Sequence, residues 1–361
     1  MMSKSKNKYL YLITILFVLL AAAAIATMFA LKKQGNQPTK MEYNAVSAEK
    51  FMMDTFVKQT TYDQSADAKQ KLEEMFSYLT EFEKKVSMHL PDSEISKVNN
   101  SAGVSAVTVS DETYQLLKRS KELCSQSNGM FDITIGPVVK LWGITSDSPH
   151  VPADSEIKSY LKRVGISKLS LNDEKKTAKL TNPYMEIDLG GIAKGYACDL
   201  AKQKYQELGL DSGLLSLGGN IYSFGTKPDG TAFIIGLRDP RGGENDLMGN
   251  LTAPGKVVAT TGDYERYFEQ DGKRYHHVLD PKTGYPAETD LIAVTVITEE
   301  GALADFLSTT FFIAGKEAVL KNLDNDKFDI IAVDKEMKVY VSEGMKRNFK
   351  LTNTETYQLA E

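Results

Sequence analysis

The chain is poor in cysteine, with only Cys124 and Cys198 among its 361 residues. Both fall in stretches with helical periodicity, and neither belongs to a Cys-x-x-Cys or Cys/His pattern. The sequence therefore offers no disulfide framework and no zinc site. We expect two small buried side chains, with a single disulfide bridge between them as the alternative.

Blocks of like charge are also missing from the body of the chain. Lys and Arg number 43 against 48 Asp and Glu, which gives a net charge of −5, and the basic residues are scattered among acidic ones. A nucleic-acid-binding domain normally gathers its positive charge on one face or in one stretch. The composition therefore argues against nucleic acid as the main partner.

One long apolar run is present, at the N-terminus. Residues 9–31 carry no charge and have lysines on both sides. About 20 apolar residues suffice to cross a bilayer, so we predict one transmembrane helix in the cell membrane, with residues 1–8 in the cytoplasm and the rest outside the cell. A cleaved signal peptide is the alternative, although residues 26–30 match a cleavage site poorly. Residues 32–48 are polar and predict a linker.

Residues 49–361 contain no second linker and no repeat. We predict one bilobed domain of the α+β class, with helices packed on a mostly antiparallel sheet. Capping signals and apolar periodicity predict its helices, and β-rich runs predict its strands. The predicted helices are Asp67–Lys85, Asp111–Ser127, Ile192–Leu208 and Gly301–Ile313. The predicted strands are Met52–Thr60, Leu214–Phe224, Phe233–Arg238, Leu291–Ile297, Phe328–Val333 and Lys338–Ser342.

The strongest local motif is the glycine turn DLGGIAKG, residues 188–195. We expect a strand to end at Ile187, the two glycines to turn the chain, and a helix to begin. Such a turn presents main-chain N–H groups and a helix N-terminus to a phosphate, and Lys194 would add a positive charge. The alternative is a turn that only lets strand and helix pack closely, which a short glycine motif often is.

A second candidate site lies in the last long helix. Asp305 and Thr309 are one turn apart and share a helix face. A carboxylate and a hydroxyl suit Mg²⁺, which prefers oxygen ligands and completes its shell with water and substrate phosphate. The surrounding helix is apolar, so Asp305 would be partly buried and would need a partner. A solvated Asp and a Thr bonded to its own helix are the alternative.

Two of the four histidines are adjacent, His276 and His277. Neighbouring side chains on a strand point to opposite faces, so at most one of them faces a given site. We expect His276 at the surface. His277, beside Asp280, is the candidate base for a hydroxyl nucleophile. The single tryptophan, Trp142, is expected in the core.

Together these stretches resemble the ApbE family of FAD:protein FMN transferases. The resemblance covers about Phe51 to Gly315 and rests on an ordered series of motifs: MDT, PDSEIS with Asn99, FDITIGPVVKLWG, DLGGIAKGYACD, SLGGNI, TTGDYERYF, YHHVLDPKTGYPA, and VTVI followed by ADFLST. It implies an ApbE-like fold and Mg²⁺-dependent transfer of FMN from FAD to a Thr or Ser hydroxyl of an acceptor protein. The product would be a phosphoester, with release of AMP.

The resemblance also implies roles for single residues. Asp305, Thr309 and the main-chain carbonyl of Gly191 would bind the metal, and His277 would be the base. Asp188 would be a second catalytic residue. The positions that would contact FAD are Met53, His89, Met130, Phe131, Asp132, Asp188, Lys194 and Leu279. Three positions depart from the family pattern: His89 replaces a Tyr against the flavin, Thr261 replaces a Ser, and Asp54 replaces a Gly.

Two other functions stay open at this stage. One is a Mg²⁺-dependent FAD pyrophosphatase, in which water replaces the acceptor hydroxyl and FMN and AMP are released. The other is a protein that binds FAD without turnover. The chain has no acceptor segment of the type Asp-x-x-Ser/Thr-x-Ala-Thr, so it is not expected to modify itself. The expected acceptor is an extracellular or membrane-associated flavoprotein of a respiratory or electron-export chain.

Overall fold

A nine-stranded sheet forms the centre of the structure, a computed structural model that describes residues 44–360. Its neighbouring strands are antiparallel except for the last pair. In spatial order the strands are β1 (Val46–Met52), β2 (Thr55–Thr61), β6 (Gly213–Leu217), β7 (Asn220–Phe224), β10 (Val257–Gly262), β13 (Leu291–Thr298), β14 (Asp329–Asp334), β15 (Lys338–Val341) and β17 (Gln358–Leu359).

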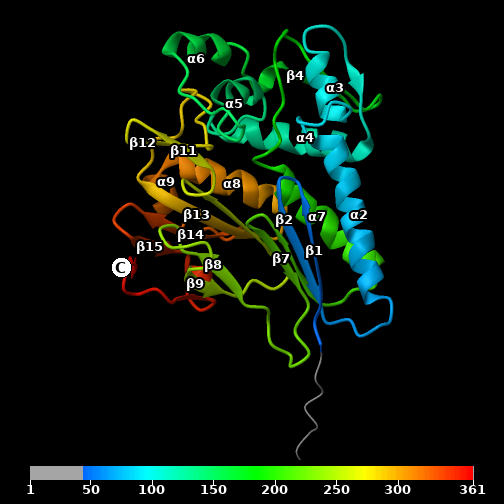
Figure 1. Ribbon diagram of the computed structural model, residues 1–361, viewed down its shortest axis with the longest axis vertical. Coiled ribbons are helices and arrows are strands. Elements are labelled where there is room, and N and C mark those ends of the chain that lie inside the picture. The colour runs from blue at the N-terminus through cyan, green and yellow to red at the C-terminus, as the bar shows by residue number, and fades with distance from the viewer. Residues whose placement is uncertain (1–43, 361) are drawn as a thin grey trace, which may run out of the picture. The chain divides into compact units, whose positions relative to one another are not determined.

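Both faces of this sheet are covered. One face carries the helices α2 (Ala68–Val86), α7 (Ala193–Glu207) and α8 (Gly301–Ala314), and the other carries a small sheet of β8 (Ile235–Arg238), β9 (Leu247–Leu251) and β16 (Phe349–Leu351) (Figure 1). In β14, Ile330 and Ala332 belong to the core under the helices, whereas Ile331 and Val333 belong to the core under the small sheet. Because both of its faces are buried, β14 is apolar at consecutive positions.

Shorter elements complete the unit. A group at one end of the helix layer comprises α3 (Glu94–Asn100), α4 (Asp111–Gln126), α5 (Gly136–Trp142), α6 (Asp154–Leu161) and η1 (Ile166–Lys168), with a sheet of β3 (Val107–Thr108), β5 (Thr177–Leu180) and β4 (Leu169–Asn172) (Figure 1). The rest are the hairpin β11 (Tyr267–Gln270) and β12 (Lys273–His276), α9 (Lys316–Leu320) and η2 (Glu343–Met345). The residues from Ala45 onward form one compact unit.

The helices α7 and α8 touch through their backbones. A Cβ on Gly195 would lie 2.0 Å from the carbonyl oxygen of Gly301. Each helix also supplies a carboxylate to the first turn of the other. Asp199 of α7 accepts the N–H groups of Gly301 (2.6 Å) and Ala302 (2.9 Å), and Asp305 of α8 accepts the N–H of Gly195 (2.6 Å). These bonds satisfy N–H groups that a helix start leaves unpaired.

The structure confirms the α+β class, with helices on a mostly antiparallel sheet, and the four predicted helices, each to within one residue at either end. Of these four helices, only α4 has a side-chain N-cap, from Ser110, so apolar periodicity was the main signal for the other three. Both cysteines are free and buried, as expected. Trp142 is fully buried and its indole N–H donates to the carbonyl of Gly284 at 2.7 Å, which confirms a core role.

Two strand predictions were wrong because each hides a hairpin. The predicted strand Met52–Thr60 turns at Met53 and Asp54, whose φ angles are 50° and 57°. The predicted strand Leu214–Phe224 turns at Gly218 and Gly219, with φ angles of 56° and 96°. Two-residue turns with two positive φ angles follow the twist of an antiparallel pair. A tight hairpin therefore replaces a single long strand in both places.

The strand expected to end at Ile187 was also wrong. The chain there is extended but forms only an isolated bridge between Ile135 and Glu186. The predicted cytoplasmic residues 1–8, the predicted transmembrane helix 9–31 and most of the predicted linker 32–48 lie outside the described residues. The linker was predicted to end too late, because β1 already begins at Val46. No helix in the described part of the chain is long and apolar enough to span a bilayer.

Because α7 and α8 are in backbone contact, adding one methyl group at Gly195 is expected to lower the stability of the fold strongly. Gly195→Ala is expected to destabilise the fold by about 3 kcal/mol or more, because the new Cβ meets backbone that cannot move aside. Thermal unfolding followed by circular dichroism measures the effect. Gln203→Ala, on the exposed side of α7, is the control and should leave Tm unchanged. Equal Tm values for the two variants would contradict this description of the contact.

Candidate active site

A pocket of about 650 Å³ collects residues from segments far apart in the chain. It is bordered by the turn between β1 and β2, the loops around α5, the start of α7, the turn between β6 and β7, the segment around β10 to β12, and α8. The lining includes every residue predicted to act in catalysis, to contact FAD or to bind the metal: Met53, His89, Met130, Phe131, Asp132, Asp188, Gly191, Lys194, His277, Leu279, Asp305 and Thr309. One cavity thus unites the separate motifs.

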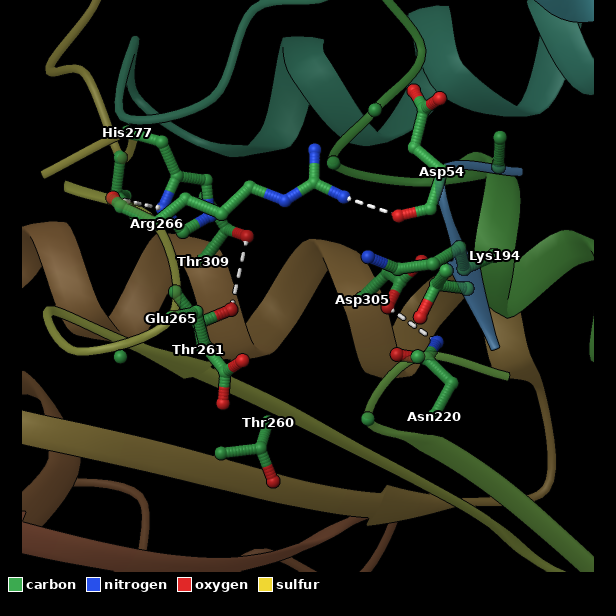
Figure 2. Close-up of a pocket in the computed structure, with 18 of the residues that line it drawn as sticks. Asp54, Lys194, Asn220, Thr260, Thr261, Glu265, Arg266, His277, Asp305 and Thr309 are labelled. Carbon is green, nitrogen blue, oxygen red and sulfur yellow. Dashed lines mark hydrogen bonds between the residues drawn. The ribbon is translucent and has the colours of Figure 1, made fainter. Parts of the chain in front are cut away.

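Asp305 is the buried carboxylate of this pocket, with 7% of its surface exposed. One carboxylate oxygen accepts the Gly195 N–H, and the other accepts the side-chain amide of Asn220 at 2.6 Å (Figure 2). Burial raises the pKa of Asp305, while the positive charge of Lys194 and these two hydrogen bonds act in the opposite direction. In the described part of the chain no ion pair involves Asp305, so its charge rests on neutral donors.

Thr309 belongs to a row of hydroxyl groups. Its Oγ1 lies 3.3 Å from Oγ1 of Thr261, which lies 2.8 Å from Oγ of Ser308. Ser308 in turn donates to the carbonyl of Asp305 at 3.0 Å. Thr261 thus supplies the hydroxyl that connects Thr309 and Ser308 in this row.

The donor set around Asp305 fits a hard cation with few protein ligands. The described residues contain no cluster of three His, Cys, Asp or Glu side chains placed to hold a metal. Asp305, Thr309 and the Gly191 carbonyl would supply one carboxylate, one hydroxyl and one carbonyl. Mg²⁺ is commonly bound by one or two carboxylates together with substrate phosphates and water. The set is therefore sufficient for Mg²⁺ only when a phosphate-bearing substrate is present.

The DLGG turn is held by hydrogen bonds within the protein. Asn99 brackets Ile187, accepting its N–H (2.7 Å) and donating to its carbonyl (3.0 Å). Asp188 accepts the Gly190 N–H at 2.7 Å, and its own N–H donates to Ile133 at 2.7 Å. Burial raises the pKa of Asp188. The side chain of Asp188 thus shapes the turn as well as lining the pocket.

Positive charge meets this turn at the start of α7. The helix begins at Ala193 without a side-chain N-cap, so its positive end faces the pocket. Lys194 follows, and in Figure 2 its side chain lies beside Asp305 and Asn220. Among the described residues its ammonium group forms no ion pair or hydrogen bond. An ammonium group and an uncapped helix start together attract an anion such as phosphate.

Part of the pocket lining, next to the DLGG turn, is apolar. Phe131 packs edge-to-face on Phe306, with ring centroids 5.3 Å apart, and a Cβ on Gly191 would lie 3.0 Å from its ring. Met130 and Leu279 line the same cavity. This apolar surface suits a flat aromatic ring system.

Asp132 supports that apolar part. Its Oδ1 accepts the N–H and the hydroxyl of Thr134 at 2.8 and 2.6 Å, and its Oδ2 accepts the N–H of Ile166 at 2.9 Å. Its carboxylate is therefore committed to holding the loop that carries Phe131.

The rim is formed in part by the turn between β1 and β2. The N–H of Met53 donates to Glu83 at 2.9 Å, and the carbonyl of Asp54 accepts from the guanidinium of Arg266 at 2.8 Å. These two bonds hold non-glycine residues at positive φ, a conformation that costs energy and recurs at functional sites. His89 is exposed at the same rim.

His277 is oriented by a single carbonyl group. The carbonyl oxygen of Arg266 accepts the main-chain N–H of His277 at 3.0 Å and lies 3.2 Å from its Nδ1. A carbonyl can only accept, so Nδ1 carries the proton and Nε2 keeps a free lone pair. Burial, Lys194 and His276 lower the pKa of His277 well below its usual value. The imidazole is therefore neutral at physiological pH.

The expectation of a surface position for His276 was wrong. Its side chain is buried, with 8% exposed, and its ring packs edge-on against Phe312 of α8. Its Nε2 lies 3.2 Å from the carbonyl of Ala287. The alternation of neighbouring side chains does hold, because His276 faces the core and His277 faces the pocket.

Two pocket residues were missed in the sequence. Asn220 holds Asp305, and Arg266 holds His277 through its carbonyl and the turn between β1 and β2 through its side chain (Figure 2). Both lie within motifs that the resemblance rests on. Asn220 lies 85 positions from Asp305, and Arg266 lies 212 positions from Asp54, so no local spacing marks these two contacts, whereas His277 is only 11 positions from Arg266.

Comparisons with known proteins agree with this geometry. A family model described as the ApbE family matches residues 53–333. The FAD:protein FMN transferase of Klebsiella pneumoniae is 34% identical over 76% of this chain and 85% of its own length. That of Treponema pallidum is 35% identical over 70% of this chain and 74% of its own length.

Two solved structures share the fold. The crystal structure of the ApbE protein from Thermotoga maritima has 33% identity and a TM-score of 0.75, over 86% of this chain and 98% of that one. The flavin transferase ApbE from Vibrio cholerae has 28% identity and a TM-score of 0.76, over 84% of this chain and 99% of that one. With the motifs gathered in one pocket and relatives matched over most of their lengths, the chain belongs to the ApbE family.

Proposed function

We propose that this protein is an FAD:protein FMN transferase. It would move FMN from FAD to a Thr or Ser hydroxyl of an acceptor protein and release AMP. The observation that carries the proposal is the meeting, in one pocket, of a buried carboxylate, a positive helix end with Lys194, and the neutral His277. The transferases of Klebsiella pneumoniae and Treponema pallidum support it.

The polar part of the pocket suits the pyrophosphate of FAD. Asp305, Thr309 and the Gly191 carbonyl would hold Mg²⁺, which supplies Lewis-acid stabilisation of charge on the phosphates. Lys194 and the start of α7 would add positive charge from the protein itself. The apolar part, with Phe131, would take the isoalloxazine ring.

The neutral His277 suits a general base. Because its Nδ1–H is held by Arg266, its Nε2 is free to remove the proton from the acceptor hydroxyl. The hydroxyl oxygen then bonds to the phosphorus of the FMN half, and the bond from that phosphorus to the bridging oxygen breaks. AMP leaves with the electron pair of that bond.

Hydrolysis is a second outcome of the same site. His89 is exposed at the pocket rim, at a position where the resemblance to the ApbE family implies a larger Tyr ring. A smaller side chain leaves room for water, which would replace the acceptor hydroxyl and yield free FMN and AMP.

We also propose that residues 9–31 anchor the enzyme in the cell membrane and that the site faces outward, toward an extracellular acceptor flavoprotein. The support is the charge-free run with basic flanks. Purification of the membrane fraction and sequencing of the mature N-terminus tests this. A mature start near Leu31 would contradict an uncleaved anchor.

The transfer itself is tested by intact mass. The full chain in detergent is mixed with FAD, Mg²⁺ and a peptide that carries the motif Asp-x-x-Thr-x-Ala-Thr. The peptide is expected to gain one FMN, and EDTA or Asp305→Ala should abolish the gain. Asp173→Ala, a change of an exposed aspartate outside the pocket, is the control. Free FMN without modified peptide would indicate the hydrolase, and intact FAD would contradict both reactions.

The role of His277 predicts a pH dependence. An unfolded chain titrates a histidine near pH 6.5, whereas the pKa of His277 is lowered in the fold. Between these two values the unfolded chain binds the extra proton, so this residue makes stability rise with pH there. NMR of the imidazole nitrogens should show Nε2 unprotonated from pH 8 down through 6.5. A titration midpoint at or above 6.5 would contradict the assignment.

Substitution of His277 tests the same role by rate. His277→Asn is expected to slow transfer by ~10²–10⁴-fold, the usual contribution of a positioned base. FAD affinity, measured by flavin fluorescence, should change little, because the substitution removes the base and leaves the phosphate and ring contacts. A rate within a few-fold of the unaltered protein would exclude His277 as the base.

A further inference from the structure

A second recess adjoins the proposed flavin pocket. It has a volume of about 590 Å³ and opens widely to solvent. Its lining consists of Asp54, His89, Ile144, Thr145, Ser146, Glu265, Arg266 and Tyr267. Five of these, Asp54, His89, Thr145, Glu265 and Arg266, also line the flavin pocket. The two cavities therefore share a wall, and we call the second one the outer recess.

Arg266 forms the centre of the shared wall. Figure 2 shows its side chain reaching across the pocket from beside His277 to the carbonyl of Asp54. The carbonyl oxygen of the same residue orients His277. Arg266 therefore links the outer recess, which it lines, to the proposed base, which lines the flavin pocket.

The chemistry of the outer recess differs from that of the flavin pocket. Most of its lining is polar, with two carboxylates, two small hydroxyl side chains, an imidazole and a guanidinium. Its one tyrosine, Tyr267, has the guanidinium of Arg274 4.0 Å from its ring centroid, so one face of that ring is already covered. The recess offers no apolar slot for a flavin or an adenine ring, but many partners for amide groups and polar side chains.

Transfer needs a second substrate to reach the phosphorus that His277 faces. The flavin pocket, with an apolar part and a phosphate-binding part, matches the needs of FAD alone. The outer recess is the remaining approach to the shared wall, and it is open enough for a polypeptide that runs on past the site.

We propose that the outer recess is the acceptor subsite, where an extended segment of the acceptor protein places its Thr or Ser hydroxyl against the wall formed by Arg266. This rests on the proposed transferase function. The hydroxyl proton passes to Nε2 of His277, the hydroxyl oxygen bonds to phosphorus, and AMP departs with the electrons of the broken phosphorus–oxygen bond. Both halves of FAD lie in the flavin pocket during this step.

The test measures two binding constants without turnover. The full chain in detergent is loaded with FAD in EDTA, and a fluorescein-labelled peptide carrying the acceptor motif is titrated by anisotropy. Tyr267→Ala is expected to weaken peptide binding at least tenfold. FAD affinity should be unchanged, because Tyr267 lines only the outer recess.

The matched control is Tyr184→Ala. Tyr184 is exposed, has Arg163 5.4 Å from its ring centroid, and lines neither cavity. It should change neither constant. Ser146→Trp, at an exposed position that lines the outer recess but not the flavin pocket, is a second variant, which fills the recess with a large side chain. Ser146→Trp should also weaken peptide binding and leave FAD affinity unchanged.

Three results would overturn the proposal. Weaker FAD binding in Tyr267→Ala and Ser146→Trp would show that the recess holds part of FAD. Unchanged peptide affinity in both variants would place the acceptor elsewhere. If the unaltered protein binds FAD but does not bind the peptide even at millimolar concentration, the acceptor also binds elsewhere. Failure of the transferase function is seen separately, as unmodified peptide in the intact-mass assay with Mg²⁺, because the binding constants need no reaction.

Discussion

The site depends on the contact between α7 and α8. Two glycines let the helix backbones touch, and Asp199 and Asp305 each accept N–H groups from the other helix. Burial raises the pKa of Asp199 to about 6 even though two main-chain N–H groups donate to it. Carboxylates held in this way are costly to leave unpaired. The helix pair can therefore form only in the arrangement that satisfies both.

That arrangement fixes the chemistry of the pocket before any substrate arrives. Asp305 is held by Gly195 of α7 and by Asn220 at the start of β7. Lys194 precedes Gly195, so its charge comes to the same place. The carboxylate of Asp305, held by neutral donors, lies beside the positive start of α7. These charges are in place before phosphate binds, so little rearrangement is needed when it does.

The sequence predicts what local signals encode. The helices followed mainly from apolar periodicity, and the motifs named residues that do share one pocket. The turn at Met53 and Asp54 contains no glycine or proline that would have marked it in the sequence. Hydrogen bonds with the distant residues Glu83 and Arg266 hold it instead. The pair Gly218-Gly219 is a hairpin signal in the sequence, but the strand prediction Leu214–Phe224 ran through it. The burial of His276 depends on α8, which the sequence around it does not reveal.

The order of strands in the sheet has a consequence for when the active site can form during synthesis and folding. β2 pairs with β6, and the hydroxyl of Thr61 donates to a carbonyl 151 positions along the chain. Until β6 has been synthesised, the edge of β2 that pairs with β6 in the completed sheet is open. Pairings of this range close slowly. The pocket, whose lining runs from Met53 to Val333, is therefore complete only after most of the chain has been synthesised.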